Sequence, residues 1–178
     1  SIAYADDFTA GEMNTAGIIE NNDILITPNF RPSQIGVTDK LALGTFLLGN
    51  AGGILNLGAK YGIIQNDDSM LSATAFFGYE LAWEDEDTGE AGGGAPWVFT
   101  ALDYSMMVGD NWLSFNGGVG ITTEDSGVSV GGSNLAVTYL MLNGDKAWEF
   151  ELWANPYGMT VDGAEIADTV GARAQWFK

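Results

Sequence analysis

The stretch SMLSATAFFGYELAWEDEDTGE (residues 69–90) alternates between apolar side chains and small or polar ones. Every second residue from Leu71 to Trp83 is apolar, and the positions between carry mostly serine, threonine and glycine, with a carboxylate at Glu80. Phe76 and Ala82 are the exceptions. Because successive side chains of a β-strand point to opposite faces of a sheet, this period predicts a strand with one apolar face. The medium that contacts this face, protein or lipid, decides the fold.

The same period of two residues recurs along most of the chain, and the helical period of 3.6 residues is nearly absent. Clusters of Gly, Asn and Asp separate the alternating stretches, as is typical of strands joined by turns. The pattern therefore predicts an all-β protein. The predicted strands cover residues 40–48, 54–64, 69–84, 96–108, 111–122, 133–143, 146–156 and 168–177.

The N-terminal region does not follow this pattern clearly. Pro28 and Pro32 disfavour a central sheet position for the apolar run around them. We expect an extended N-terminal segment over residues 1–39, which forms an extra hairpin or a plug, and a β-barrel domain over residues 40–178. The first residues, SIAYADDFTAGE, lack a basic start and an apolar run. We therefore expect the sequence of an exported protein from which a signal peptide has been removed.

The connections between the predicted strands alternate in length. Residues 65–69, 108–111 and 143–146 have the composition of tight turns. In contrast, residues 84–96, 123–133 and 155–168 are long and polar. The alternation predicts an up-and-down antiparallel sheet with tight turns at one end and long loops at the other.

The composition excludes several classes of function. Only 17% of the residues are charged, against roughly 25% in ordinary soluble domains, yet the net charge is -18. Six lysines and arginines in total leave little to neutralise phosphates, which argues against nucleic-acid binding. The chain has no cysteine and no histidine, so it lacks thiolate chemistry and the commonest general base and metal ligand.

Two kinds of sheet fit the alternation. In a soluble sandwich or lipocalin-like barrel, the apolar face is buried and the polar face carries charges of both signs. Here the polar face is mostly glycine, serine and threonine, which suits the crowded interior of a narrow membrane barrel with its apolar face toward lipid. We therefore predict a closed antiparallel up-and-down transmembrane β-barrel of eight strands, or of ten if the N-terminal segment adds a hairpin. A sheet in lipid has to close, because its backbone groups find no water there.

Five tryptophans lie near the predicted strand ends. Tryptophan favours the two membrane–water interfaces, so two aromatic girdles are predicted, one at each rim. Ordinary core aromatics near strand ends are the alternative. The predicted interfacial residues are Trp83 and Trp97 at the loop end and Trp112, Trp148 and Trp176 at the turn end.

These features resemble the small bacterial outer-membrane β-barrels, similar to the OmpA transmembrane domain and OmpX-type eight-stranded proteins. The resemblance covers residues 40–178 and includes the final VGARAQWFK, which is similar to the terminal strand that the barrel-assembly machinery reads in that class. Lys178 stands where the class usually ends in phenylalanine, and Phe177 lies one place earlier. The resemblance implies export to the outer membrane of a Gram-negative cell envelope and names no activity.

Charged residues on the polar face are few, and we expect them to pair inside the barrel because an isolated charge there is costly. Folding the last two strands together places Arg173 opposite Glu149 and Glu151. Glu80 is expected to pair across the interior with Arg173 or Lys60. A structural network is favoured over a polar path for ions, since eight strands enclose little more than their own side chains. The predicted interior network is Lys60, Glu80, Asp103, Glu149, Glu151 and Arg173.

Neither catalysis nor a cofactor is predicted. Glu149 and Glu151 lie about 7 Å apart along a strand face, but no nucleophile or base accompanies them. The acidic loops offer hard oxygen ligands of the kind that Ca²⁺ prefers, yet none matches an EF-hand loop, so a solvated acidic rim is favoured. The weaker calcium candidates are Asp85, Asp87, Glu124 and Asp125.

The function expected from these observations is that of a porin-like outer-membrane β-barrel with a structural or interaction role, embedded in the lipid bilayer, as one subunit of a larger envelope assembly. External loops 84–96, 123–133 and 155–168 would contact protein partners. Two alternatives stay open. One is a narrow passive pore for ions or small solutes. The other is a soluble secreted β-protein that binds an apolar ligand or forms an extracellular assembly.

Overall fold

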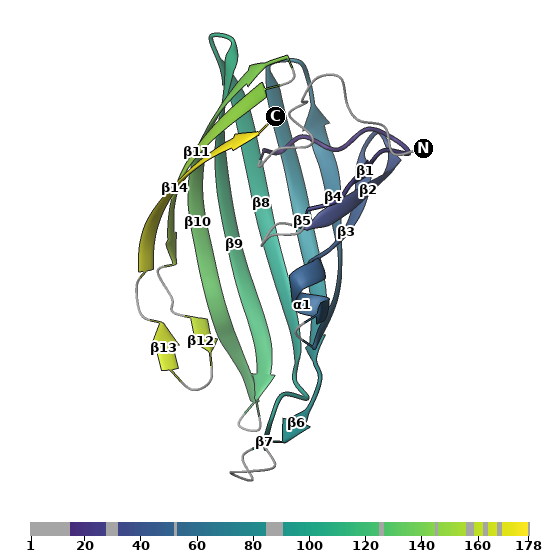
Figure 1. The fold of residues 1–178 in the computed structure, drawn as a ribbon, viewed down its shortest axis with the longest axis vertical. Coiled ribbons are helices and arrows are strands. Elements are labelled where there is room, and N and C mark those ends of the chain that lie inside the picture. Colours follow the sequence, from purple (N-terminus) through teal and green to yellow (C-terminus); the bar gives the residue numbers. More distant parts are fainter. Residues whose placement is uncertain are drawn as a thin grey trace.

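A computed structural model describes residues 15–27, 32–51, 53–84, 91–124, 127–144, 146–155, 159–161, 164–166 and 169–177. One antiparallel sheet of ten strands dominates this part of the chain, in the order β1-β2-β3-β4-β5-β8-β9-β10-β11-β14. Strands that are neighbours in the chain are neighbours in the sheet, which curls strongly about its long axis (Figure 1).

The strands of the sheet are β1 (Ile24–Leu25), β2 (Ser33–Thr38), β3 (Leu41–Thr45), β4 (Ile54–Gln65), β5 (Ser69–Glu80), β8 (Pro96–Val108), β9 (Asn111–Glu124), β10 (Gly127–Asn143), β11 (Lys146–Asn155) and β14 (Thr169–Phe177). Two short hairpins stand apart from it, namely β6 (Trp83–Glu84) with β7 (Ala91–Gly92) and β12 (Met159–Val161) with β13 (Ala164–Ile166). A short helix, α1 (Leu47–Ala51), follows β3. None of the helices in the described ranges has the length and apolar content of a membrane span.

The all-β prediction is confirmed, and each of the eight predicted strands corresponds to a strand of the sheet. The N-terminal region adds β1 and β2, which gives the ten strands of the alternative prediction. The strand predicted over residues 69–84 is divided in the structure: β5 ends at Glu80, and Trp83–Glu84 forms β6 of a separate hairpin.

The prediction of a long loop over residues 123–133 is wrong. β9 and β10 continue through it and pair from Gly127 opposite Glu124 onward, with a bulge between Val130 and Gly132. The glycines and serines of this stretch suggested a loop, but Val128 and Val130 keep the alternation with β-branched residues that favour a strand. The predicted loop regions 84–96 and 155–168 contain the β6–β7 and β12–β13 hairpins.

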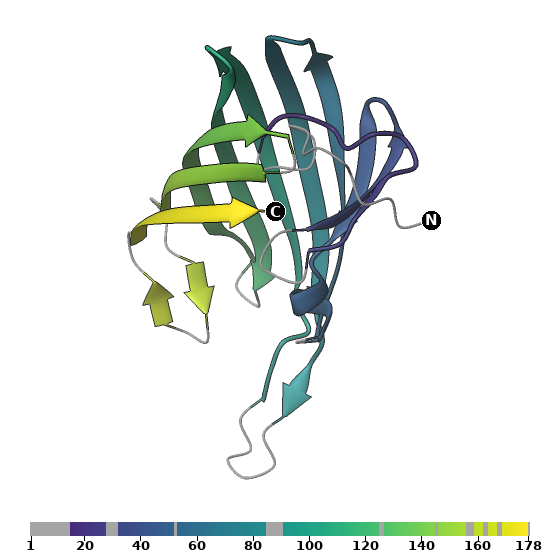
Figure 2. The same ribbon diagram turned by 45° about the horizontal axis from the view of Figure 1, so that its top comes forward.

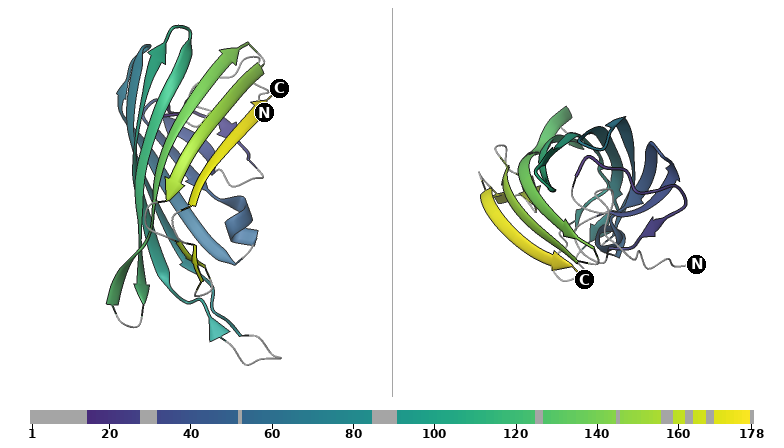
Figure 3. Two further views of the ribbon diagram at one scale, coloured as in Figure 1. Left: turned by 90° about the vertical axis from the view of Figure 1, so that its left-hand side faces the viewer. Right: turned by 90° about the horizontal axis from the view of Figure 1, so that it is seen from above.

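The prediction of a closed barrel is also wrong, because β1 and β14 are the two edges of the sheet and, among the described residues, do not pair with each other. Seen from above, β14 and β1 lie on either side of an opening in the curled sheet (Figure 3). The strands on the N-terminal side explain the opening. β1 has only two residues, whereas β14 has nine, so β1 offers too short an edge to match it.

The two ends of the sheet differ as predicted. The connections between β4 and β5, β8 and β9, and β10 and β11 are tight turns at one end. α1 and the two small hairpins lie toward the other end (Figures 1 and 2). Gly109 and Gly144 occupy two of the tight turns with φ of 65° and 59°, a backbone conformation that side chains disfavour.

The two faces of the sheet have opposite chemistry. On the outer, convex face large apolar side chains are exposed, among them Phe77 at 55% and Leu152 at 63%. The inner, concave face carries small and polar residues and a buried apolar cluster near the tight turns. Exposed apolar residues on the eight long or central strands include Leu43, Leu57, Phe77, Leu102, Phe115, Leu135, Leu152 and Trp176. The buried cluster consists of Ala16, Met70, Trp112, Leu140 and Ala147.

Candidate functional site

The concave face is the candidate site, and part of the chain's own N-terminal segment lies on it. Residues 15–19 lie inside the curl, where Ala16 is 0% exposed. The amide of Ala16 donates to Ser105 Oγ at 2.7 Å, and Lys60 Nζ donates to the carbonyl oxygen of Thr15. Gln65 accepts from the amide of Ile18 at 3.2 Å and donates to the carbonyl oxygen of Ala16 at 3.0 Å. Side chains of β4 and β8 thus fasten this segment by four hydrogen bonds.

Gly36 allows the N-terminal segment to pass close to β2 where it leaves the interior. A Cβ atom at Gly36 would overlap the carbonyl oxygen of Glu20, so only glycine allows the two backbones to come this close. The amide of Asn22 donates to the carbonyl of Gly36, and the amide of Gly36 donates to the carbonyl of Asp23, both at 3.0 Å. The chain then enters β1 at the edge of the sheet.

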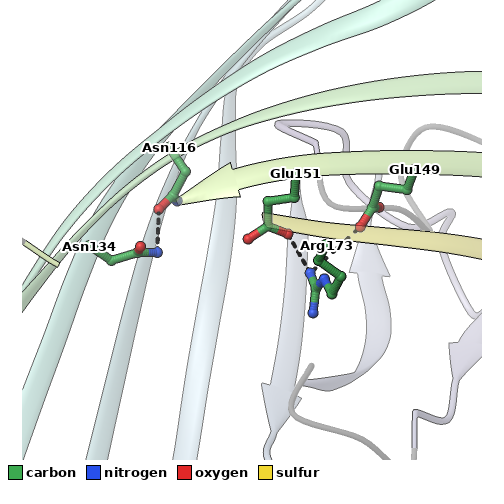
Figure 4. Close-up of polar contacts among 5 residues, drawn as sticks. All are labelled: Asn116, Asn134, Glu149, Glu151 and Arg173. Atoms are coloured by element: carbon green, nitrogen blue, oxygen red, sulfur yellow. Dashed lines mark hydrogen bonds and ion pairs between the residues drawn. The ribbon is translucent and has the colours of Figure 1, made fainter. Parts of the chain in front are cut away.

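Asp103 is the centre of a polar network on the concave face. This carboxylate is 9% exposed and accepts hydrogen bonds from Ser72 at 3.5 Å, from Thr74 at 3.2 Å and from Asn116. Asn134 Nδ2 in turn donates to Asn116 Oδ1 at 3.1 Å (Figure 4). The network joins β5, β8, β9 and β10, and its donors offset the cost of removing the carboxylate from water.

A second network joins the last two strands of the sheet. Arg173 lies directly opposite Glu151 in the register of β11 and β14. Its Nη2 contacts Glu151 and lies 3.6 Å from Glu149, whose exposure is 1% (Figure 4). The strand pattern predicted that these three residues would meet, and the structure brings them together.

Glu80 and Lys60 behave differently from the prediction. Lys60 faces Thr74 across β4 and β5, donates to the Thr15 carbonyl oxygen and lines the same cavity as Asp103. Among the described residues, Glu80 takes part in no ion pair, so its predicted pairing with Arg173 or Lys60 is wrong. Glu80 is the last residue of β5, at the end of the sheet opposite the segment that engages Lys60.

Glycines on the concave face make room for aromatic rings of adjacent strands. A Cβ atom at Gly78 would overlap the Trp97 ring, and one at Gly58 would overlap the Phe76 ring. The same relation holds for Gly118 with Phe99 and for Gly171 with Trp153. The glycine-rich polar face therefore follows from packing, as expected for a crowded interior.

A cavity of about 150 Å³ remains on the concave face. Lys60 and Asp103 supply its charged groups, and the Phe76 and Phe99 rings supply its apolar wall. Thr15 also lines it, so the internal segment forms part of the wall. The cavity is too small for a drug-sized ligand, for which pockets usually measure about 300–1,000 Å³.

The two predicted tryptophan girdles do not form as described. Trp148 and Trp176 are exposed on the convex face, and their ring centroids are 6.3 Å apart. Trp112 is instead 9% exposed in the buried cluster, and Trp97 packs on the concave face over Gly78, so placing these two in an outward girdle was wrong. Their positions in the alternation could have shown this, because Trp112 has the parity of Ser114 and Trp97 that of Phe99. The side chain of Trp83 lies outside the described part.

The calcium candidates mostly fall outside the described residues. This applies to Asp85, Asp87 and Asp125 and to the side chain of Glu124. Within the described ranges, no group of three or more His, Cys, Asp or Glu residues is arranged to hold a metal ion. Chemically, the concave face combines paired charges with hydrogen-bonded amides and hydroxyls, which suits holding strands together.

Comparisons with protein-family models, with curated proteins and with solved structures found no match to this chain. The resemblance to small outer-membrane barrels therefore stays a prediction, and a function has to be argued from the two faces of the sheet.

Proposed function

We propose that this chain is an outer-membrane β-protein with a structural or interaction role, embedded with its convex face against lipid. The exposed apolar side chains of that face carry the proposal, since they run from β3 through β14. Lipid is the medium in which such a face is stable. Export through the barrel-assembly machinery and placement in the Gram-negative outer membrane follow from the same proposal.

A soluble alternative fits the faces less well. The largest apolar patch on a typical soluble monomer measures about 300–600 Å², whereas here apolar residues are exposed on most strands of the sheet. A secreted protein that binds an apolar ligand would also need an apolar interior. The interior here carries Asp103, Glu149 and Lys60 and a cavity of about 150 Å³.

The free edges of the sheet favour a role in an assembly. Unpaired backbone groups are costly in lipid, and an exposed strand edge readily pairs with another strand. Within the part of the chain that the structure describes, β14 presents nine residues of such an edge. If a neighbouring subunit covers this edge in the membrane, the backbone groups of the edge are paired and no further strand can add to it.

The cavity with Lys60 and Asp103 supports a second candidate, a narrow passive pore. Residues 15–19 and the buried apolar cluster occupy the interior near the tight turns, however. We therefore expect the intact protein to conduct poorly, and planar-bilayer recordings measure this directly.

Flotation tests the membrane proposal. The full chain is refolded with phosphatidylcholine–phosphatidylglycerol vesicles and centrifuged through a density gradient, with a carbonate wash to remove peripheral protein. We expect the protein to float with the vesicles and to show heat-modifiable migration on detergent gels. Full solubility without detergent, together with absence from the floated fraction, would overturn the proposal.

A further inference from the structure

Two opposite charges line the cavity on the concave face. Lys60 comes from β4 and Asp103 from β8, and the other described residues of the lining are uncharged. The chain as a whole has a net charge of -18. A lining in which one cation balances one anion therefore does not follow from the composition.

These two charged groups do not neutralise each other by direct contact. Both ion pairs found among the described residues involve Arg173, so Lys60 and Asp103 do not form one. Thr74 lies opposite Lys60 in the register of β4 and β5 and donates to Asp103 at 3.2 Å, so its side chain adjoins both groups. A cation and an anion thus line the cavity at separate positions.

The rest of the lining sets the size and the character of a ligand. Phe76 and Phe99 form an apolar wall, and Gln34 and Asn116 contribute amides. The cavity measures about 150 Å³, a volume that admits a ligand of about the size of benzene. Lys60 and Gln34 are half-buried, so the lining is open to solvent on their side. A small solute with polar and apolar parts fits these surroundings.

We infer that the cavity binds a small zwitterion of the size of an α-amino acid such as alanine. The carboxylate of the ligand contacts the Lys60 ammonium, and its ammonium contacts the Asp103 carboxylate. Its apolar side chain lies against the phenylalanine rings. Each charged end of the ligand then pairs with one protein charge, which offsets the cost of removing both groups from water.

Other small solutes match the two charges less well. A simple anion at Lys60 brings a second negative charge close to Asp103, and a simple cation at Asp103 brings a second positive charge close to Lys60. Like charges at such short range repel each other. A neutral polar molecule avoids this repulsion, but its hydrogen bonds carry a charge on the protein side only and are weaker than those of a zwitterion.

A ligand series tests the charge requirement on the unaltered chain. The full chain is refolded in detergent micelles, and its binding of alanine, propionate, ethylamine and glycerol is measured by isothermal titration calorimetry. Propionate lacks the ammonium of alanine, ethylamine lacks its carboxylate, and glycerol is neutral. We expect alanine to bind at least about tenfold more tightly than each of the others, because it alone makes two charge-assisted contacts. Absence of saturable alanine binding, or equal or tighter binding of another solute, would overturn the inference.

Two variants assign the two ends of the ligand. Asp103→Asn keeps the size of the side chain and removes its charge, so it should weaken alanine binding by about tenfold. Propionate should then bind at least as tightly as alanine. Lys60→Met removes the ammonium, and in this variant ethylamine should bind at least as tightly as alanine. Glu80→Gln neutralises a carboxylate that is not among the described residues of the lining, and this matched control should bind like the parent.

Two controls keep these outcomes interpretable. Cooperative urea unfolding, followed by tryptophan fluorescence, shows which variants are folded, and the ligand series on the parent needs no variant. Folded variants that keep the ligand preference of the parent, or that lose all four solutes equally, would contradict the assigned contacts. Binding in micelles is measured separately from vesicle flotation, so a failure of solute binding is distinguished from a failure of membrane insertion.

Discussion

Arg173 of β14 lies directly opposite Glu151 of β11 and contacts its carboxylate, while the same guanidinium nitrogen lies 3.6 Å from Glu149. One cation thus compensates two carboxylates on the concave face, at the strand where the sheet ends. Removing Arg173 would take a cation away from two carboxylates in a poorly solvated place. The edge strand therefore depends on this contact for its position.

Arg173→Ala should destabilise the fold by about 2–3 kcal/mol. This lies below the roughly 3–5 kcal/mol of a fully buried pair, because the arginine side chain is one-third exposed. Urea unfolding followed by tryptophan fluorescence measures the loss. Adding Glu149→Gln to the variant should recover part of the stability, since it removes one of the two neighbouring negative charges that Arg173 contacts. An additive double-mutant cycle would show that the two residues are not coupled.

Gly78→Ala should destabilise the protein by about 1–3 kcal/mol, because its methyl group would overlap the Trp97 ring in a packed interior. Gly117→Ala is the matched control. Its Cβ atom would meet only Leu135 Cδ2 at 3.6 Å, an ordinary contact. The control should be neutral or up to about 1 kcal/mol more stable, through a less flexible unfolded chain. Equal unfolding midpoints for the two variants would contradict the packing explanation.

Asp103→Ala should cost about 1–3 kcal/mol, since it leaves the donors of Ser72, Thr74 and Asn116 without their shared acceptor. Asp103→Asn keeps one acceptor oxygen and should cost less. Chemical denaturation of the three proteins under one condition checks the order. If the alanine variant were as stable as the parent, the network would contribute nothing measurable.

Phe77→Asp should weaken membrane insertion, because it places a carboxylate on the convex face where Phe77 is exposed. The expected cost is about 1–3 kcal/mol, depending on depth in the bilayer. Phe77→Leu keeps an apolar side chain and is the control, and Glu80→Leu changes the interior without adding charge to the convex face. Vesicle flotation across a urea series gives the comparison. Identical flotation of the Asp and Leu variants would argue against lipid contact at this residue.

Weakening the contacts of residues 15–19 should expose them. In an Ala16→Cys background the thiol should react slowly with a maleimide, because Ala16 is fully buried. Adding Gln65→Ala and Ser105→Ala removes three of the four hydrogen bonds and should speed labelling at least tenfold. Asp110→Cys, in an exposed turn, serves as a control that should label quickly in both backgrounds. Fast labelling of Ala16→Cys in the parent background would show that the segment is not held inside.

Much of the sheet was predictable from local patterns. The alternation located the strands, the parity of each residue assigned its face, and the turn composition placed the tight connections at one end. The meeting of Arg173 with Glu149 and Glu151 also followed, because a hairpin of known register brings specific residues together. The alternation also indicated that Trp112 points inward, although its position near a strand end suggested a place at the membrane–water interface.

What the sequence by itself determined is therefore the part governed by covalent geometry: a strand alternates its side chains whatever surrounds it. Tertiary structure alone decided that β1 and β14 stay apart, which side chains hold residues 15–19 in the interior and that Glu80 has no charged partner among the described residues. These outcomes depend on how edges of unequal length meet and on which backbone fits against Gly36 and Ser105. Contacts between segments far apart in the chain have no local period, so no pattern along the sequence predicts them.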